Sequence, residues 1–307
     1  MELDVYQKLA NRMDQRPGGD EPALVFPLLG LASEVGSLVN QYKKRVRDGD
    51  AHELFDSKAA IELGDILWYV ANLSEKLGFT LQEIADQNLK RINERWSAEK
   101  DGAPILLLDD QYPAAEQLPR RVSVMFEEIE AVRGRTQVRL STSGTALGDP
   151  LSDMAWNEDD YRYHDAFHLT YAALLGWSPI TRSLFRCQRD SNPSFREVED
   201  SGRAKVIEEA IAALIFDYAS DENDLEGVDA IDFSLLEMVV RMASRYEVRI
   251  RTTRDWERTI LRSFEVWREL KRAHGGVVRL DLRARTIEVL PPNSIEIDSE
   301  LAPWSKK

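Results

Sequence analysis

Apolar residues recur at helical spacing through most of the first hundred residues. The pattern predicts helices over about 5–13, 24–47, 57–76 and 80–96, separated by RPGGDEP, Gly49 and Gly78. Gly49 is expected to cap the second helix, and Thr80 with Glu83 has the spacing of a capping box. Apolar residues of the third helix cover more than one face, so this helix is expected to be largely buried. The region is predicted to be an all-α four-helix module.

The spacing of apolar residues changes after residue 100. One glycine and three prolines interrupt the stretch 102–119. Alternating apolar residues over 122–126 and 138–140 then predict a β-hairpin, and 275–292 predicts a second, closing one. Between them, helices are predicted over about 159–175, 178–186, 203–219, 235–246 and 255–274. The expected fold is mainly α. It has a helical domain over 1–100, a linker over 101–120, a mostly helical α+β domain over 121–292 and a flexible tail over 293–307.

Composition narrows the possible functions. The net charge of −14 argues against a nucleic-acid partner, because polyanions bind basic surfaces. The single cysteine, Cys187, excludes an intramolecular disulfide and a cysteine-rich zinc site. The charged start has no signal-peptide core, and no uninterrupted apolar run reaches the ~18 residues of a membrane span. A cytoplasmic protein without a membrane partner is therefore expected.

Two acids stand three residues apart in the third predicted helix. At this spacing Glu62 and Asp65 point into the same space, and Glu34 lies on the helix that must pack beside them. Three converging carboxylates repel one another, which a divalent cation relieves, and oxygen ligands suit Mg²⁺ or Mn²⁺. Because Mg²⁺ commonly shares its ligands with phosphates, we expect metal-assisted attack of water on a phosphate-bearing substrate. Alternatively, the pair forms structural salt bridges with Lys43, Lys44 or Arg47.

Three stretches of the chain resemble the MazG-type all-α nucleoside triphosphate pyrophosphohydrolases, namely VYQKLANRM, LLGLASEVGSLVNQYKK and ELGDILWYVANLSEKLGFTLQEIADQNLKRINER. The resemblance implies Mg²⁺-dependent hydrolysis of a nucleoside or deoxynucleoside triphosphate to the monophosphate and pyrophosphate. It also implies a homodimer or a higher even oligomer. Carried over to this chain, it implies catalytic metal ligands at Glu34, Glu62 and Asp65. Contacts with the substrate are implied at Lys43, Lys44, Arg47, Asn88, Arg91 and Arg95.

One motif departs from the family pattern. The first acidic motif is usually EExxE, whereas this chain has SEVGS, with Ser33 and Ser37 in place of the outer glutamates. A serine offers a neutral oxygen but no charge, so a ligand is weakened or comes from Glu21, Glu53 or Asp56 on the flanking segments. The departure favours a second hypothesis, a nucleotide-binding sensor with weakened catalysis and an output through the C-terminal domain.

A second group of candidate ligands lies in the other half of the chain. His164 and His168 are four residues apart on one helical face, so Asp160, His164, His168, Glu208 and Glu209 are predicted as a possible second site. The alternatives are core histidines that order the helices, or an independent hydrolase centre. YRYHDAFHLTYAALLGWSP and VIEEAIAAL resemble the C-terminal domain of some MazG-like proteins. This resemblance does not assign an activity to the domain. Five arginines near these histidines are expected to form a solvated basic rim or an anion pocket: Arg162, Arg182, Arg186, Arg189 and Arg203.

Overall fold

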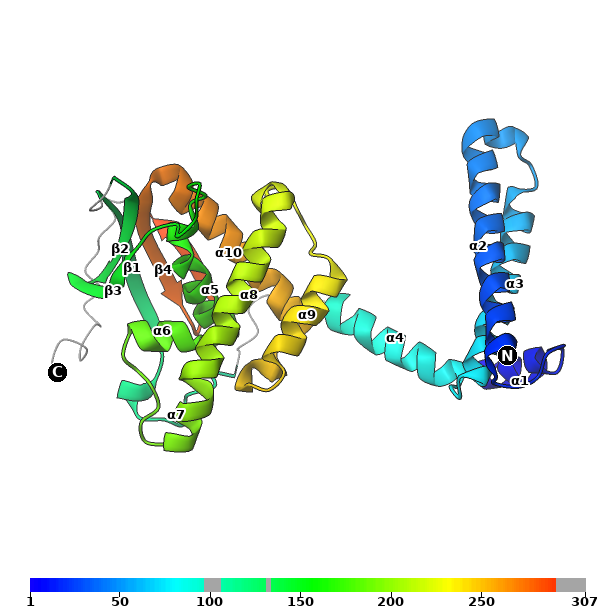
Figure 1. Cartoon of the computed structure of the whole chain (residues 1–307), viewed down its shortest axis with the longest axis horizontal. Helices are drawn as coiled ribbons and strands as arrows, with labels where there is room; N and C mark the ends of the chain where they lie inside the picture. Colours follow the sequence, from blue (N-terminus) through cyan, green and yellow to red (C-terminus); the bar gives the residue numbers. More distant parts are fainter. Residues whose placement is uncertain (97–105, 131–133, 291–307) are drawn as a thin grey trace. The chain divides into compact units, whose positions relative to one another are not determined.

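The computed structural model describes residues 1–96, 106–130 and 134–290, without the side chains of residues 94–96 (Figure 1). The chain divides into two compact units, Met1–Asn93 and Glu94–Lys307. The first is helical, and the second combines helices with an antiparallel sheet, which confirms the predicted fold class. The predicted tail and residues 101–105 of the predicted linker lie outside the described residues. Within the rest of that linker, Leu107, Leu108 and Leu118 are buried in the core of the second unit.

The first unit contains the helices α1 (Leu3–Asn11), α2 (Glu21–Asp48) and α3 (Phe55–Lys76), together with most of α4 (Leu81–Trp96). The Asp20 side chain accepts a hydrogen bond from the backbone of Ala23 and begins α2, and Gly49 ends it at a φ of 60°. Thr80 and Glu83 form the predicted capping box, since each side chain accepts a hydrogen bond from the other's backbone NH. Local sequence signals therefore account for where these helices begin and end.

Buried contacts in the first unit gather at one end of the α2–α3 hairpin. A small apolar cluster of Ala10, Ala71 and Leu81 joins α1 to α3 and to the start of α4. Lys76 pairs with Asp14 at 2.6 Å, and the indole of Trp68 donates to the carbonyl of Ala10 at 3.2 Å. The prediction that α3 is largely buried is wrong. Several of its large apolar side chains are exposed, because α1 and α2 cover only part of its surface: Ile61, Leu63 and Leu67.

Helix α2 carries an exposed apolar surface as well. Within the described ranges, the segment Glu21–Ala51 is long and apolar enough by length and composition to cross a membrane, with a mean hydropathy of 1.6. Only 11% of that apolar window is buried within the unit. The sequence expectation overlooked this helix because it required an uninterrupted apolar run, whereas Glu34 and two serines interrupt the window.

The second unit is built on a five-stranded antiparallel sheet of order β3-β2-β1-β4-β5. Its strands are β1 (Arg121–Glu130), β2 (Thr136–Thr142), β3 (Thr145–Leu151), β4 (Gly275–Asp281) and β5 (Thr286–Leu290). Pairing of β1 with β4 joins the two predicted hairpins, with Val124 opposite Val278. Gly275 has a φ of +120°, and a Cβ there would lie 2.5 Å from the carbonyl oxygen of Phe126, so only glycine fits this close approach.

Six helices of the second unit pack together and against the sheet: α5 (Asp165–Leu175), α6 (Pro179–Leu184), α7 (Pro193–Glu199), α8 (Gly202–Asp221), α9 (Phe233–Ala243) and α10 (Thr253–Ala273). Helices α5 and α10 pack against each other and against β4 and β5 (Figure 1). Every residue of α5 is buried, so this helix is the centre of the core. The side chains that α5 presents to α8 are therefore held in place by packing on all sides.

Buried ion pairs take up three of the five arginines expected on a basic rim, so that expectation is wrong for Arg162, Arg182 and Arg189. Arg182 pairs with Asp109 at 2.6 Å. Arg189 is fully buried between Asp200 and Glu247, with 2.7 Å to a Glu247 oxygen. Arg162 pairs with Asp153 at 2.8 Å. Buried guanidinium groups are costly to leave unpaired, and acids from other segments of the second unit satisfy them.

Glu199 lies beside the ion pairs of Arg189 and makes the stability of the protein depend on pH. Its carboxylate is buried and accepts hydrogen bonds from the backbone NH of Glu247. Burial, together with the charge of Glu247, raises the pKa of Glu199 to about 7. Because this folded-state pKa is above the unfolded value, the contribution of Glu199 to stability is complete below about pH 4.5 and is lost as the pH rises through about 7.

We therefore expect Glu199→Gln to be more stable than the parent at pH 8.5, by on the order of 2 kcal/mol after allowance for solvent screening. At pH 4.5 the two proteins should be nearly equal, since the glutamate is then neutral. Urea unfolding at both pH values measures the difference. A Glu199→Gln effect that is the same at both pH values would contradict the raised pKa.

Candidate functional site

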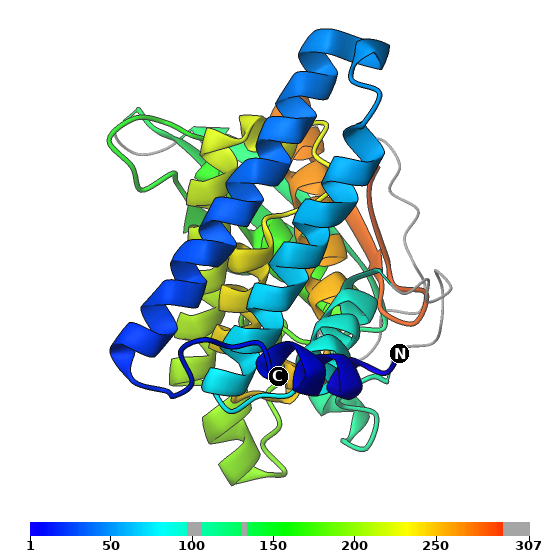
Figure 2. The same ribbon diagram turned by 90° about the vertical axis from the view of Figure 1, so that its right-hand side faces the viewer.

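Helices α2 and α3 lie side by side (Figure 2). The three predicted acids lie on the facing surfaces of these helices. Gly30 allows this packing, because a Cβ at that position would lie 2.2 Å from the ring of Tyr69. Gly30 is one turn before Glu34 on α2, and Tyr69 is one turn after Asp65 on α3. The contact between glycine and tyrosine therefore fixes the spacing of the two helices next to the acids.

The carboxylates of Glu34, Glu62 and Asp65 converge. Each offers one oxygen, and the three oxygens lie within 4.8 Å of one another. Burial raises the pKa of Glu34, and the negative charges of Asp65 and Glu62 raise it further. Around these three groups the structure shows no lysine or arginine within ion-pair distance among the residues it describes. Their mutual repulsion is therefore not relieved by a protein cation, which is the electrostatic condition that favours a bound metal ion.

The predicted cationic residues take different places. Arg47 pairs with Asp48 at 2.6 Å and does not reach the acids, and no described ion pair joins Lys43 or Lys44 to Glu62 or Asp65. Gln41, rather than a lysine, contacts the cluster: its amide nitrogen donates to Glu62 at 3.3 Å. Lys44 is half-buried one turn beyond Gln41 on the same side of α2. The other residues expected to contact substrate lie on α4, where Asn88 and Arg91 are exposed and the side chain of Arg95 is outside the described part of the chain.

The substitute ligands considered for the missing glutamates do not join the cluster. Glu21 precedes Glu34 by thirteen residues, which is about 20 Å along a helix. Glu53 and Asp56 are exposed near the start of α3 and are not part of the converging group within the described ranges. Ser37 is half-buried one turn after Glu34, on the same side of α2, whereas Ser33 is exposed. The charge of the cluster therefore comes from three carboxylates.

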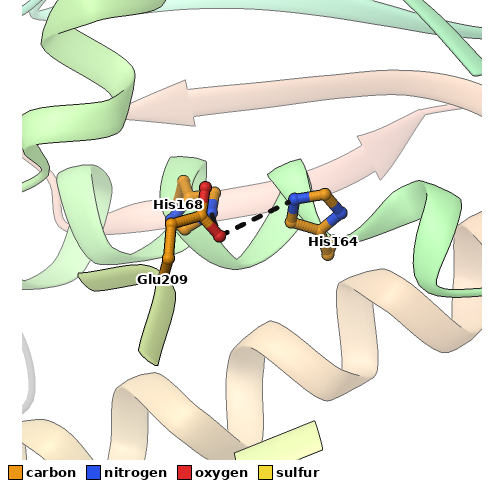
Figure 3. Close-up of side chains that lie close together, drawn as sticks. All are labelled: His164, His168 and Glu209. Carbon is orange, nitrogen blue, oxygen red and sulfur yellow. Dashed lines mark ion pairs between the residues drawn. The ribbon is translucent and has the colours of Figure 1, made fainter. Parts of the chain in front are cut away.

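A second converging group lies in the other unit, where α5 meets α8. One nitrogen each of His164 and His168 and one oxygen of Glu209 lie within 4.8 Å of one another (Figure 3). The two remaining predicted members take other places. Glu208 hydrogen-bonds to the far side of the His168 ring at 2.9 Å, and Asp160 pairs with Arg162 and Lys271. The structure thus selects Glu209 over its neighbour, a distinction that the sequence alone did not make.

Comparison with known proteins identifies the family to which the chain belongs. Residues 103–293 match the family model of the MazG C-terminal domain, which covers more than half of the chain. The chain belongs to the MazG C-terminal domain family. It is also similar to the Gene 37 protein of Mycobacterium phage L5, with 34% identity over 102 residues that cover 31% of this chain and 89% of the phage protein. No solved structure matches.

Family membership confirms the predicted resemblance to MazG-like proteins and favours a nucleotide pyrophosphohydrolase-like protein. It assigns no substrate, metal or mechanism. His164, His168 and Glu209 lie within the segment that matches the MazG C-terminal domain. The carboxylates of α2 and α3 lie outside it, so their role depends on their own geometry and on the sequence resemblance of the first hundred residues.

Proposed function

We propose that the chain is a Mg²⁺-dependent nucleoside triphosphate pyrophosphohydrolase that converts a nucleoside or deoxynucleoside triphosphate and water to the monophosphate and pyrophosphate. The observation that carries the proposal is the convergence of Glu34, Glu62 and Asp65 within 4.8 Å without a cationic partner in the described residues. Carboxylate oxygens are the donors that Mg²⁺ and Mn²⁺ prefer, so this donor set fits the proposed ion.

In this proposal some residues of the chain hold the ion and others orient the substrate. Glu34, Glu62 and Asp65 would hold Mg²⁺, and Gln41 would keep the Glu62 carboxylate in place through its amide nitrogen. When bound, Mg²⁺ neutralises phosphate charge and lowers the pKa of water. With one oxygen from each of the three carboxylates, these residues would hold Mg²⁺ and leave room for water and for phosphate oxygens. A carboxylate of the cluster would accept the proton from the attacking water.

Lys44 is the cation of α2 best placed to meet the triphosphate. Lys44 lies one turn beyond Gln41 on α2, and the amide of Gln41 contacts Glu62. The flexible side chain of Lys44 therefore begins close to the Glu62 carboxylate. No described ion pair engages Lys44, which leaves its ammonium group available for phosphate. Arg47 lies on the next turn, but its pairing with Asp48 would have to break before it could contact the substrate.

The proposal is tested by incubating the protein with Mg²⁺ and each canonical nucleoside and deoxynucleoside triphosphate. Pyrophosphate and the nucleoside monophosphate are then quantified together. The proposal predicts equal amounts of the two products with at least one nucleotide, and no reaction when Mg²⁺ is chelated. Release of orthophosphate and diphosphate instead would contradict the proposed site of bond cleavage.

A second candidate function is a nucleotide sensor with weakened catalysis. The observation that favours it is that only three carboxylates gather among the residues that the structure describes, with Ser37 where the family motif has a glutamate. Tight, Mg²⁺-dependent binding of a triphosphate without turnover would support the sensor over the enzyme. Calorimetric titration with each triphosphate, followed by product analysis of the same sample, separates the two functions.

We also propose that the exposed apolar surface of α2 and α3 is covered by a second copy of the chain. Leu29 is 66% exposed, Val39 61% and Ile61 62%, which is unfavourable for such large apolar side chains on an isolated helical pair. Multi-angle light scattering should give an even multiple of the 35.1 kDa chain mass. Leu29→Glu is expected to lower that mass, whereas Met13→Glu, a matched change at another exposed apolar residue, leaves it unchanged. A monomeric mass, or flotation of the protein with phospholipid vesicles, would contradict the proposal.

A further inference from the structure

The histidine cluster between α5 and α8 has each imidazole fixed through one ring nitrogen. His164 Nδ1 lies 2.8 Å from the carbonyl oxygen of Tyr161, and since a carbonyl only accepts, Nδ1 donates. His168 Nδ1 lies 2.9 Å from the carboxylate of Glu208, which also accepts from the Ser178 hydroxyl at 2.6 Å. The neutral form of each ring then carries its lone pair on Nε2. A buried carboxylate or carbonyl behind a histidine is the usual support of a metal-binding imidazole.

Both Nε2 atoms face the same oxygen of Glu209. The distance to Glu209 Oε2 is 3.9 Å from His164 Nε2 and 3.4 Å from His168 Nε2 (Figure 3). Ligands about 2.05 Å from a tetrahedral Zn²⁺ are roughly 3.3 Å apart, so these atoms need only small movements to share one ion. The Tyr161 ring stacks on His164 with 4.3 Å between centroids and 6° between planes, which limits rotation of that imidazole.

An unsatisfied buried nitrogen distinguishes this cluster from a set of ordinary core histidines. The side chain of His168 is fully buried, and its Nε2 has no hydrogen-bond partner among the residues that the structure describes. Such an atom is costly unless something binds it. Its nearest acceptor is Glu209 Oε2 at 3.4 Å, which forms an ion pair only with a protonated imidazole. In the neutral ring the buried lone pair of Nε2 therefore faces no donor and is available to a metal ion.

We infer that His164, His168 and Glu209 form a binding site for a first-row transition-metal dication, with Zn²⁺ as the preferred ion. Two imidazoles and one carboxylate suit Zn²⁺ rather than Mg²⁺, which prefers oxygen ligands and is bound by few imidazoles. The side chain of Glu209 is 43% exposed, so the fourth position of a tetrahedral ion opens toward solvent. The site is therefore of the open kind, with room for a water molecule or an exogenous ligand, and it ties α5 to α8.

The test uses the full chain without an affinity tag, stripped of metal with a chelator and dialysed into buffer with millimolar Mg²⁺. The Mg²⁺ is present in large excess to compete with Zn²⁺ for the carboxylates of α2 and α3, and Zn²⁺ binding is then titrated by calorimetry. We expect one Zn²⁺ per chain and a higher melting temperature with Zn²⁺. Co²⁺ should give the intense visible absorption of a tetrahedral site.

Two variants and one control assign the site. Glu209→Gln and His164→Gln should each weaken Zn²⁺ binding at least about 100-fold, because loss of a ligand exceeds the effect of losing its supporting residue. Asp217→Asn, at an exposed acid on the same helix, should bind Zn²⁺ like the parent. Circular dichroism of each variant confirms that it is folded. Failure of the parent to bind Zn²⁺, or Zn²⁺ binding by the two ligand variants as tight as that of the parent, would overturn the inference. Neither outcome depends on whether the chain hydrolyses nucleotides.

Discussion

The double variant Glu62→Gln/Asp65→Asn is expected to release pyrophosphate at least about 10³-fold more slowly than the parent, because metal-ion charge stabilisation contributes several kcal/mol to such reactions. Both substitutions preserve side-chain size and remove charge, so the packing of α3 against α2 should persist. The expected loss is in turnover and in the apparent affinity for Mg²⁺ together. Steady-state kinetics over a range of Mg²⁺ concentrations measures both.

The chain offers a closely matched control for this experiment. Glu53 and Asp56 have the same spacing and residue types as Glu62 and Asp65, and both are exposed outside the cluster. The variant Glu53→Gln/Asp56→Asn therefore makes the same chemical changes without touching the proposed ligands, and it should keep full activity. An active Glu62→Gln/Asp65→Asn protein would remove the metal assignment. A control that lost activity would show that one of its acids replaces the missing glutamate.

A second large effect is expected on stability at Asp200. This fully buried carboxylate accepts from the Arg189 backbone at 2.8 Å and pairs with the Arg189 side chain, and it lies 3.6 Å from Arg182. Removing one partner of a buried ion pair typically costs about 3–5 kcal/mol, because the remaining charge is left uncompensated. Asp200→Ala should therefore lower the free energy of unfolding by that amount, as measured by urea denaturation.

An exposed ion pair on a neighbouring segment provides the comparison. Asp190 pairs with Arg196 at 2.7 Å, but the two side chains are 68% and 52% exposed. Solvent-exposed pairs contribute about 0–1 kcal/mol, so Asp190→Asn should change stability little. If Asp200→Ala were no more destabilising than Asp190→Asn, the buried network would not hold the second unit together as the contacts indicate.

Elements with strong local signals could be predicted from the sequence. The end of α2 at Gly49 and the start of α4 at Thr80 follow from caps that involve residues close together in the chain. Strand β3 was not predicted, because Gly148 and Pro150 interrupt its alternation, and an edge strand tolerates both. Helix α7 was also missed, although Asn192 followed by Pro193 is a helix-start signal that could have revealed it.

The two candidate sites differ in how far the sequence could define them. Glu62 and Asp65 share one helix, and Glu34 lies on the adjacent one, so local spacing and antiparallel packing suffice to predict that they converge. Choosing between Glu208 and Glu209 requires the rotation of α8 relative to α5, which depends on the whole core. The buried arginine network is less accessible still, since Asp109, Asp200 and Glu247 are far apart in the chain.

The central claim is that carboxylates of α2 and α3 hold a divalent ion, and binding of Mn²⁺ tests it most directly. Electron paramagnetic resonance of free Mn²⁺ during a titration counts the ions bound per chain. The parent and the Glu53→Gln/Asp56→Asn control should bind one more Mn²⁺ than Glu62→Gln/Asp65→Asn, and Mg²⁺ should displace that ion. Equal Mn²⁺ binding by all three proteins would contradict the claim.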